Sequence, residues 1–249
     1  MWDGFTVLKL VSFDVWNTLL SIESFYRNIA KELSDITERP QTILEKKLFH
    51  GYRELKAIRR SGGFKASTIV SVTLIEISKI LDVDSEDMRK AIIKAVTNIP
   101  PQEYVLENAK DVLEFAKKSN LKVVVVGNVV FWPGSYNKIL LEKAGFSKYI
   151  DAQFYADEVG FSKPKPEIFA KMLSELEVKP EEGLHIGDDL FEDFVGALLS
   201  SMYAVLIDKA VENIVKLSDE RGYIISNIKW LESIMMKHTP RNSLSTVST

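Results

Sequence analysis

The chain has 249 residues, of which 46% are hydrophobic and 27% charged, and 32 basic against 35 acidic side chains leave a net charge of −3. This composition is typical of a globular protein and excludes a nucleic-acid partner, because no basic surface is large enough to neutralise a phosphate backbone. The lack of cysteine excludes disulfides and thiolate chemistry, and three histidines are too few for a multi-histidine metal site. No apolar run reaches the roughly 18 residues of a membrane span and no signal-peptide pattern opens the sequence, so we expect a soluble cytoplasmic protein without a membrane partner.

The first predicted strand is a short apolar run, residues 8–13, that ends at Asp14. A carboxylate at the end of a buried strand is costly unless something there uses it. A lone aspartate in this place can also cap a turn or the next helix, so the later motifs decide between the two interpretations.

A helical block follows, at residues 21–101, where apolar side chains recur at helical spacing and no strand pattern interrupts them. Pro40 is expected at a helix start, Asp84 as a helix N-cap, and residues 61–63 as a chain break. The two prolines at 100–101 are expected to close the block, because the residue before a proline is disfavoured in helical conformation.

The rest of the chain alternates between short strands and helices, with strands expected at residues 123–126, 153–155, 184–186, 204–207 and 223–225. Such alternation with short links indicates an α/β fold with a doubly wound, mostly parallel Rossmann-like sheet covered by helices. We therefore expect an α/β core domain of residues 1–20 and 102–238, an inserted helical cap domain of residues 21–101, and a disordered tail at 239–249.

Polar side chains follow four of the predicted strands, at the point where each strand ends. They are Asp14 with Thr18, Gly127 with Asn128, Lys163, and Gly187-Asp188-Asp189 with Asp193 a helical turn later. Ligands of open α/β sheets bind outside the carboxyl ends of the strands. The four groups together therefore predict a functional site at this edge.

The residue types in this set indicate a particular chemistry. Asp14, Asp188 and either Asp189 or Asp193 would repel one another without a cation, and Mg²⁺ prefers carboxylates together with water and phosphate oxygens. Lys163 adds a positive charge that can hold a phosphate or steady a carboxylate nucleophile. A carboxylate can attack phosphorus or an electrophilic carbon and form a covalent intermediate that water hydrolyses. The set thus indicates phosphoryl transfer or displacement at carbon.

Each motif alone has a simpler interpretation. Asp188 and Asp189 also fit an ordinary N-cap pair, Lys163 a solvated loop lysine, and Asn128 a residue that holds a left-handed turn. His185 fits a core histidine that supports a neighbour, and the aromatic pair at 131–132 fits packing. The ordered combination is what makes the signal specific.

Four segments, FDVWNTLL, VVVVGN, SKPKPEIF and HIGDDLFEDFVGA, resemble in order and spacing the motifs of the haloacid dehalogenase-like hydrolase superfamily, over nearly the whole chain. The resemblance implies that Asp14 is the nucleophile, that Lys163 is the family's lysine, and that Asp14, Asp188 and the backbone carbonyl of Trp16 bind Mg²⁺. Asp189 and Asp193 are further candidate metal ligands, and Thr18, Gly127 and Asn128 are candidate substrate-binding residues. The helical insertion resembles a cap that closes over the site, excludes water and selects the substrate.

Two positions depart from the family's phosphatases. Trp16 stands where they carry a second aspartate as general acid and base, and an indole exchanges no proton with a leaving group. Gly127 stands where they carry a serine or threonine and has no hydroxyl. The aromatic residue is similar to the tyrosine of the haloacid dehalogenases proper, which use no metal, although those enzymes usually lack the Gly-Asp-Asp of residues 187–189.

Three hypotheses follow for a small-molecule substrate. The first is a Mg²⁺-dependent phosphatase for a small phosphorylated metabolite, acting through an aspartyl intermediate on Asp14. The second is a 2-haloacid dehalogenase, favoured by Trp16, and the third is a catalytically weak binding or regulatory protein on the same fold. Candidate cap contacts are Tyr26, Arg27, Arg53, Arg59 and Arg60, although a charged helical face is usually only solvated. The sequence indicates neither the substrate nor an oligomeric state.

Overall fold

The computed structural model describes residues 7–217 and 221–238, so the expected disordered tail at 239–249 lies outside the described residues. Its strands form one sheet in the order β3-β2-β1-β4-β5-β7-β6. The strands are β1 (Leu10–Phe13), β2 (Lys122–Gly127), β3 (Ala152–Tyr155), β4 (Gly183–Gly187), β5 (Tyr203–Ile207), β6 (Val215–Lys216) and β7 (Gly222–Ile225). All neighbouring strands run parallel except β6 and β7, which are antiparallel. The predicted α/β class with a mostly parallel sheet is therefore confirmed.

The central strand β1 lies between β2 and β4 and is buried on both faces. Its side chains alternate, so that Val11 and Phe13 join one hydrophobic cluster and Leu10 joins another. β2 divides in the same way, with Val123 and Val125 on one side and the two valines at 124 and 126 on the other. Burial on both faces explains why β2 contains four successive valines and why β1 is apolar except for Ser12.

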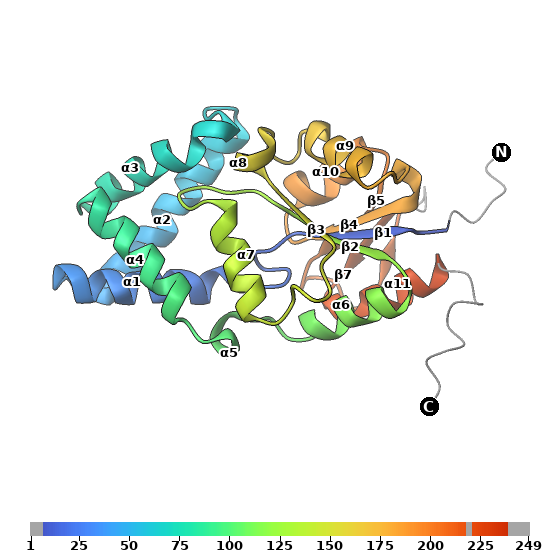
Figure 1. The fold of residues 1–249 in the computed structure, drawn as a ribbon, viewed down its shortest axis with the longest axis horizontal. Coiled ribbons are helices and arrows are strands. Elements are labelled where there is room, and N and C mark those ends of the chain that lie inside the picture. The colour runs from blue at the N-terminus through green and yellow to red at the C-terminus, as the bar shows by residue number, and fades with distance from the viewer. Residues whose placement is uncertain (1–6, 218–220, 239–249) are drawn as a thin grey trace.

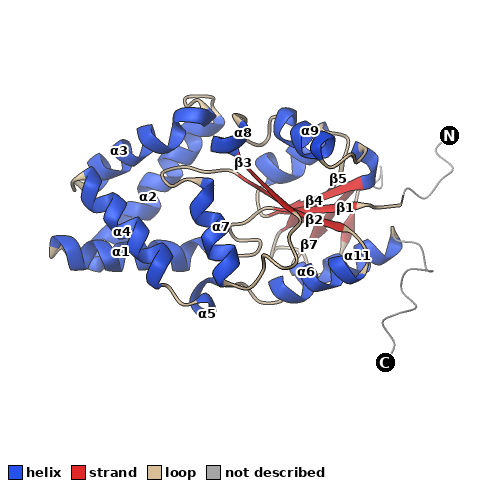
Figure 2. Cartoon of the chain, viewed as in Figure 1, coloured by secondary structure: helices blue, strands red, loops and turns tan. Residues whose placement is uncertain are grey.

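Helices cover both faces of the sheet (Figures 1 and 2). On one face lie α6 (Ala109–Lys118) and α11 (Leu231–Lys237), and on the other lie α9 (Pro166–Glu175) and α10 (Gly196–Leu199). The links between strands add α5 (Pro101–Tyr104), α7 (Gly134–Lys143) and α8 (Ala156–Val159). Within the described residues, none of these or the remaining helices combines the length and the apolar character that crossing a membrane requires.

Four further helices follow β1 and lie together beyond the end of the sheet, coloured blue to green in Figure 1. They are α1 (Ile22–Thr37), α2 (Gln41–Arg60), α3 (Ile69–Leu81) and α4 (Ser85–Asn98). α1 packs against α2 and α4, and α2 packs against α3. Residues 22–98 contain no strand, as their apolar spacing predicts. That this helical block is a separate domain stays a prediction.

The ends of these helices agree with the local sequence signals in most places. Asp84 caps α4 through its carboxylate, which accepts from the backbone N–H of Glu86 at 2.8 Å. α2 begins directly after Pro40. α4 ends at Asn98, and Ile99 and Pro100 are extended before Pro101 opens the short helix α5. Proline fits this first helical position, where its missing N–H has no helical partner.

Candidate active site

Asp14 directly follows the central strand, at the carboxyl edge of the sheet. Its backbone N–H donates to the carbonyl oxygen of Ile186 at 2.9 Å, and its side chain is largely buried. In the parallel register Phe13 lies opposite Val125 on β2 and Ile186 on β4. The segments that follow all three strands therefore converge at one place.

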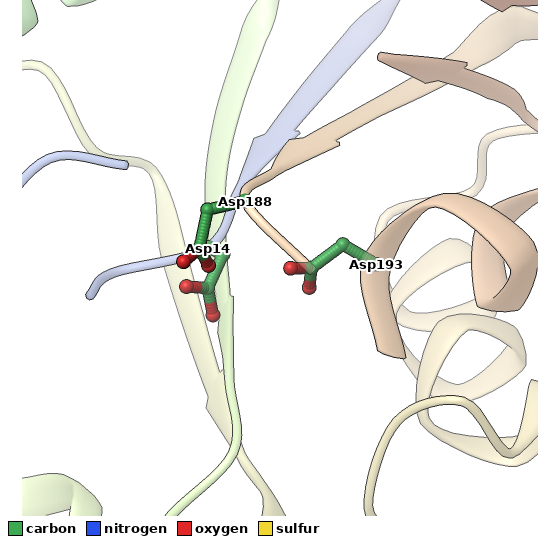
Figure 3. Close-up of side chains that lie close together, drawn as sticks. All are labelled: Asp14, Asp188 and Asp193. Atoms are coloured by element: carbon green, nitrogen blue, oxygen red, sulfur yellow. The ribbon is translucent and has the colours of Figure 1, made fainter. Parts of the chain in front are cut away.

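Three carboxylates meet there, from Asp14, Asp188 and Asp193, with one oxygen of each within 4.8 Å of the others (Figure 3). Asp188 follows β4, and Asp193 projects back from a π-helical turn, Leu190–Val195. Gly187 makes this approach possible, because a Cβ atom added there would lie 2.2 Å from the Asp193 carboxylate. The fourth motif therefore folds back on itself to bring two of its aspartates to Asp14.

Lys163 lies between two of these carboxylates and is 2% exposed. Its Nζ lies 2.7 Å from Asp14 Oδ1 and 2.6 Å from Asp193 Oδ1, and it donates to the Val126 carbonyl oxygen at 2.6 Å. Asn128 fixes the lysine's backbone, accepting from its N–H at 2.8 Å and donating to its carbonyl oxygen at 3.0 Å. The alternative of a solvated loop lysine is therefore wrong.

Burial and an excess of negative charge, three carboxylates against the ammonium group of Lys163, perturb the pKa values of these carboxylates. Burial, with repulsion by Asp193 and Asp188, raises the pKa of Asp14 to about 7, although Lys163 opposes the rise. Burial and Asp193 also raise the pKa of Asp188. The amide of Asn17 opposes this rise, because its Nδ2 donates to Asp188 Oδ2 at 3.1 Å. Burial works to raise the pKa of Asp193 too, but Lys163 and His185 lower it. A cluster of hard oxygen donors with excess negative charge fits a divalent cation such as Mg²⁺.

His185 lies beneath this cluster in the core, as the sequence predicts. Its Nδ1 lies 2.8 Å from Ser12 Oγ and its Nε2 lies 3.2 Å from Asp193 Oδ1. Burial lowers the pKa of His185 to about 4, so the ring is neutral near pH 7. We assign the proton to Nε2, because a carboxylate only accepts while a hydroxyl can donate to Nδ1. His185 thus orients the aspartate that holds Lys163.

Trp16 packs its ring in an aromatic cluster and also lines the cavity that contains Asp14. Its ring stacks on Phe25 of α1, with 5.1 Å between the ring centroids, and packs edge-to-face with Trp132, with 5.6 Å between the centroids. Trp132 and Phe131 follow β2 and pack in the same cluster, as predicted. The Trp16 indole N–H is buried and has no hydrogen-bond partner among the described residues. Position 16 therefore joins the cap helices to the core and offers no group that exchanges protons.

The missing hydroxyl at Gly127 has a structural reason, which is the ring of Tyr155. A Cβ atom added to Gly127 would lie 2.8 Å from two atoms of this buried ring, and one added to Gly134 would lie 2.3 Å from its Cγ. The Tyr155 hydroxyl donates to Gln153 at 2.9 Å. The tyrosine thus occupies the volume that a serine or threonine side chain would need.

Gly127→Ser is accordingly expected to lower the free energy of unfolding by about 1–3 kcal/mol rather than to supply a useful hydroxyl. Gly127→Ala should cost a similar amount, since the clash begins at Cβ. In a Tyr155→Ala background the cost of Gly127→Ser should largely disappear. Urea unfolding of the four proteins of this cycle measures the coupling, and strictly additive effects would contradict the steric explanation.

Comparison with known proteins agrees with this geometry. The sequence model of the hydrolase family described as haloacid dehalogenase-like hydrolase matches residues 8–198, which include all four motifs. The chain belongs to the haloacid dehalogenase-like hydrolase family. The predicted family is therefore confirmed, and the protein is a hydrolase by family.

Several curated proteins are similar to this hydrolase in sequence. A glyceraldehyde 3-phosphate phosphatase of Methanothermobacter thermautotrophicus is 23% identical over 81% of this chain and 86% of its own length. A ribulose-1,5-bisphosphate 5-phosphatase of Halopiger xanaduensis is 26% identical over 47% of this chain and 48% of its own length. The haloacid dehalogenase-like hydrolase domain-containing protein 3 of Bos taurus is 33% identical over 41% and 39%. The chain thus spans less than half the length of the latter two relatives.

Solved structures share the fold of this hydrolase. The HAD-hydrolase YfnB of Bacillus subtilis, solved with bound magnesium, superposes with a TM-score of 0.72 at 16% identity, covering 92% of this chain and 99% of that one. A dehalogenase solved with an intermediate complex has a TM-score of 0.67 at 17% identity, covering 92% and 98%. Likenesses at this identity establish the fold.

The cap helices of this hydrolase are bound to the core by an ion-pair cluster. Arg59 of α2 is buried, donates from Nη2 to both carboxylate oxygens of Glu192 at 2.7 Å, and from Nη1 to the Val129 carbonyl oxygen at 3.0 Å. Arg60 contacts Glu192 through Nε at 2.8 Å and also pairs with Asp189. Lys56 approaches Asp189 at 3.0 Å. These contacts link α2 to the core beside Asp14.

The packing of α2 against the core leaves little free space at the carboxylates. The inner cavity has a volume of about 40 Å³, and its walls include Asp14, Trp16, Asp188 and, from α2, Tyr52 and Lys56. Sites for small molecules usually measure roughly 300–1,000 Å³. A ligand of that size does not fit at the carboxylates while α2 keeps these contacts with the core.

The predicted site residues divide into two groups. The structure brings together Asp14, Lys163, Asp188 and Asp193, with Asn128 and Trp16 beside them. Asp189 lies outside the trio, capping the π-helical turn and facing α2, so that it fits the N-cap interpretation. Thr18 is buried, with no hydrogen-bond partner for its hydroxyl among the described residues. Metal binding by the Trp16 carbonyl and substrate binding by Thr18 and Gly127 stay predictions.

Among the candidate cap contacts, Arg59 and Arg60 reach the core, whereas Arg27 pairs with Glu45 within the cap and Tyr26 packs in the aromatic cluster. Lys56, Asn17 and Glu192 were not predicted. Lys56 precedes Arg59 and Arg60 by one helical turn, and this spacing is a signal for a shared face. Glu192 adjoins Asp193, but nothing in the sequence indicates a partner 133 residues away.

Proposed function

We propose that this hydrolase is a Mg²⁺-dependent phosphatase for a small phosphorylated metabolite, with Asp14 as the nucleophile. The observation that carries the proposal is the trio of Asp14, Asp188 and Asp193 with Lys163 between two of its members. A dehalogenation site has no need of three converging carboxylates. The names of the phosphatases of Methanothermobacter thermautotrophicus and Halopiger xanaduensis support the same class.

The reaction divides into two steps on Asp14. A carboxylate oxygen attacks phosphorus, the bond from phosphorus to the leaving oxygen breaks, and an aspartyl phosphate forms. Water then attacks the same phosphorus, releases inorganic phosphate and regenerates Asp14. Lys163 keeps the attacking carboxylate in place and, with Asp193, limits its rotation. Bound Mg²⁺ would be held by the trio and supplies neutralising charge for the phosphoryl oxygens.

Trp16 restricts the substrates of this phosphatase. A positioned general acid contributes typically about 10²- to 10⁴-fold, and an indole contributes none of it. The leaving group therefore departs as an anion, which favours phenols, enols and acyl or phosphoryl groups over simple alcohols.

The test is phosphate release from a series of aryl phosphates with graded leaving-group acidity, with Mg²⁺ and with a chelator. We expect Mg²⁺-dependent turnover of 4-nitrophenyl phosphate and a steep fall of kcat/KM toward phenyl phosphate. Trp16→Phe is the matched variant, since it keeps the aromatic packing, removes the unpartnered indole N–H, and should leave the slope unchanged. No Mg²⁺-dependent release from the most activated ester would contradict the proposal.

A 2-haloacid dehalogenase is the second candidate, and the observation in its favour is the aromatic residue at position 16. In that case Asp14 attacks the carbon that bears the halogen and halide leaves. Halide release from 2-chloropropionate that persists in a chelator would identify this activity and displace the phosphatase proposal.

A further inference from the structure

Two open hollows adjoin the inner cavity, and they differ in charge. The first, with a volume of about 740 Å³, is lined by Tyr52, Arg53, Lys56, Arg60 and Asp189 together with two small residues of α2 and its C-terminal end. We call it the basic hollow, because three cationic side chains face one carboxylate. The second, of about 580 Å³, includes Glu23, Asp188 and Asp208 against Lys209, and we call it the acidic hollow.

The basic hollow adjoins the inner cavity. Tyr52, Lys56 and Asp189 line both the hollow and the inner cavity beside Asp14. The acidic hollow reaches the cavity through Asn17 and Asp188. Because like charges repel an anion on the acidic side, a phosphate ester is drawn to the basic side and a metal cation to the acidic side.

The cations of the basic hollow exceed what the cap needs for its closure. Lys56 and Arg60 both pair with Asp189. Arg60 also contacts Glu192, which forms the buried pair with Arg59 outside the hollow, so three cations share two carboxylates. Arg53 is exposed, and no ion pair among the described residues includes it. A ligand-sized hollow next to the site therefore carries positive charge that no carboxylate of the described chain neutralises.

We propose that the basic hollow binds a second anionic group of the substrate, a phosphate or a carboxylate, while the first phosphate lies at Asp14 and Lys163. This inference rests on the proposed function and adds a substrate class, small metabolites with two anionic groups. Arg53 and Lys56 are the specificity residues, and both act on bound substrate without touching the reacting phosphorus. When the cap opens, Lys56 and Arg60 lose their contacts with Asp189, and an anionic group of the substrate takes the place of that carboxylate.

Binding of phosphonates in the presence of Mg²⁺, measured by titration calorimetry, tests the proposal without turnover, because the carbon–phosphorus bond resists a phosphatase. The probes are alkane-α,ω-bisphosphonates of three to six carbons and the alkyl monophosphonates of the same lengths. We expect the bisphosphonate of the fitting length to bind at least about tenfold more tightly than its monophosphonate, as charge-assisted contacts allow. ω-Phosphonocarboxylates of that length distinguish a carboxylate from a phosphate as the second group.

Variants locate the preference on α2. Arg53→Gln and Lys56→Gln should each reduce the bisphosphonate preference by about fivefold or more, whereas Lys46→Gln, which removes the same charge from the same helix outside the hollow, should preserve it. A preference below about twofold at every length, or one that survives both variants, overturns the proposal. If the aryl phosphate test fails while the Arg53-dependent preference is present, the hollow is an anion site and the phosphatase chemistry is what fails. Absence of all phosphonate binding overturns this inference, and the aryl phosphate test then decides the phosphatase proposal by itself.

Discussion

Arg59→Met is expected to lower the free energy of unfolding by about 3 kcal/mol. The substitution removes the bidentate partner of a buried carboxylate and leaves Glu192 with Arg60 and the amide of Asn128. Desolvating a carboxylate without full compensation is what makes such losses large. Urea denaturation followed by circular dichroism measures the loss, and Lys56→Met is the matched control, since its partly exposed pair should contribute less than about 1 kcal/mol.

The double variant Arg59→Met/Glu192→Gln should recover much of this loss, because it removes the unpaired charge as well. Acid titration gives a second signature. Burial works to raise the pKa of Glu192, but Arg59 and Lys56 lower it to about 2, so Glu192 stabilises the fold above its ordinary pKa and the contribution is lost as the pH falls toward 2. Arg59→Met should make stability less sensitive to acid in this range. Equal losses in the single and double variants would contradict the assignment of this pair.

Asp14→Asn is expected to reduce kcat by roughly 10⁴-fold or more, because it removes the attacking oxygen. The same substitution should raise the melting temperature of the metal-free protein. The amide introduced at this position has no proton to lose, whereas wild-type Asp14 ionises beside two other carboxylates. A catalytic loss without a loss of folding separates removal of the nucleophile from damage to the structure.

The sign of the pH dependence follows from the raised pKa of Asp14, about 7 against an ordinary 3.8. The folded protein holds this proton more tightly than the unfolded chain does, so wild-type stability falls as the pH rises from about 4 through 7. The advantage of Asp14→Asn in melting temperature should therefore grow from pH 5 to pH 8. Mg²⁺ should remove most of that difference by stabilising the wild type. Calorimetric scans at both pH values measure it, and an advantage that is larger at pH 5 would contradict the raised pKa.

Most of the sheet could be predicted because its strands carry a local signal. The run at 123–126 is apolar throughout and the run at 184–186 is apolar except for His185, and each is followed by a glycine and a polar side chain. β6 was not predicted, since its two residues are exposed and belong to the sheet only through pairing with β7. The order of the motifs placed Asp14, Lys163 and Asp188 at one edge, because parallel strands direct their ends the same way.

The rest of the site depends on contacts that no local pattern encodes. Asp189 and Asp193 both suit a metal in sequence, and the π-helical turn, by its geometry, directs Asp193 to the trio and Asp189 to α2. The ring of Tyr155, which belongs to another strand, fills the space beside Gly127. The sequence alone does not show this contact, so the glycine suggests only that a hydroxyl has been lost. Trp16 likewise suggested a changed reaction, while the structure places it in the packing between α1 and the core.

The fourth motif has two structural roles within one short segment. Asp188 and Asp193 face Asp14, while Asp189 and Glu192, between them in sequence, face α2 of the cap. Ligand occupancy at the carboxylates and closure of the cap thus act on the same short stretch of chain. If closure of the cap changes the ligand affinity of the site by some factor, then ligand binding must change the equilibrium constant for closure by the same factor. The substitution Arg60→Gln on α2 should therefore alter the affinity of the site for a metal ion, although Arg60 contacts none of the three carboxylates that would bind the metal.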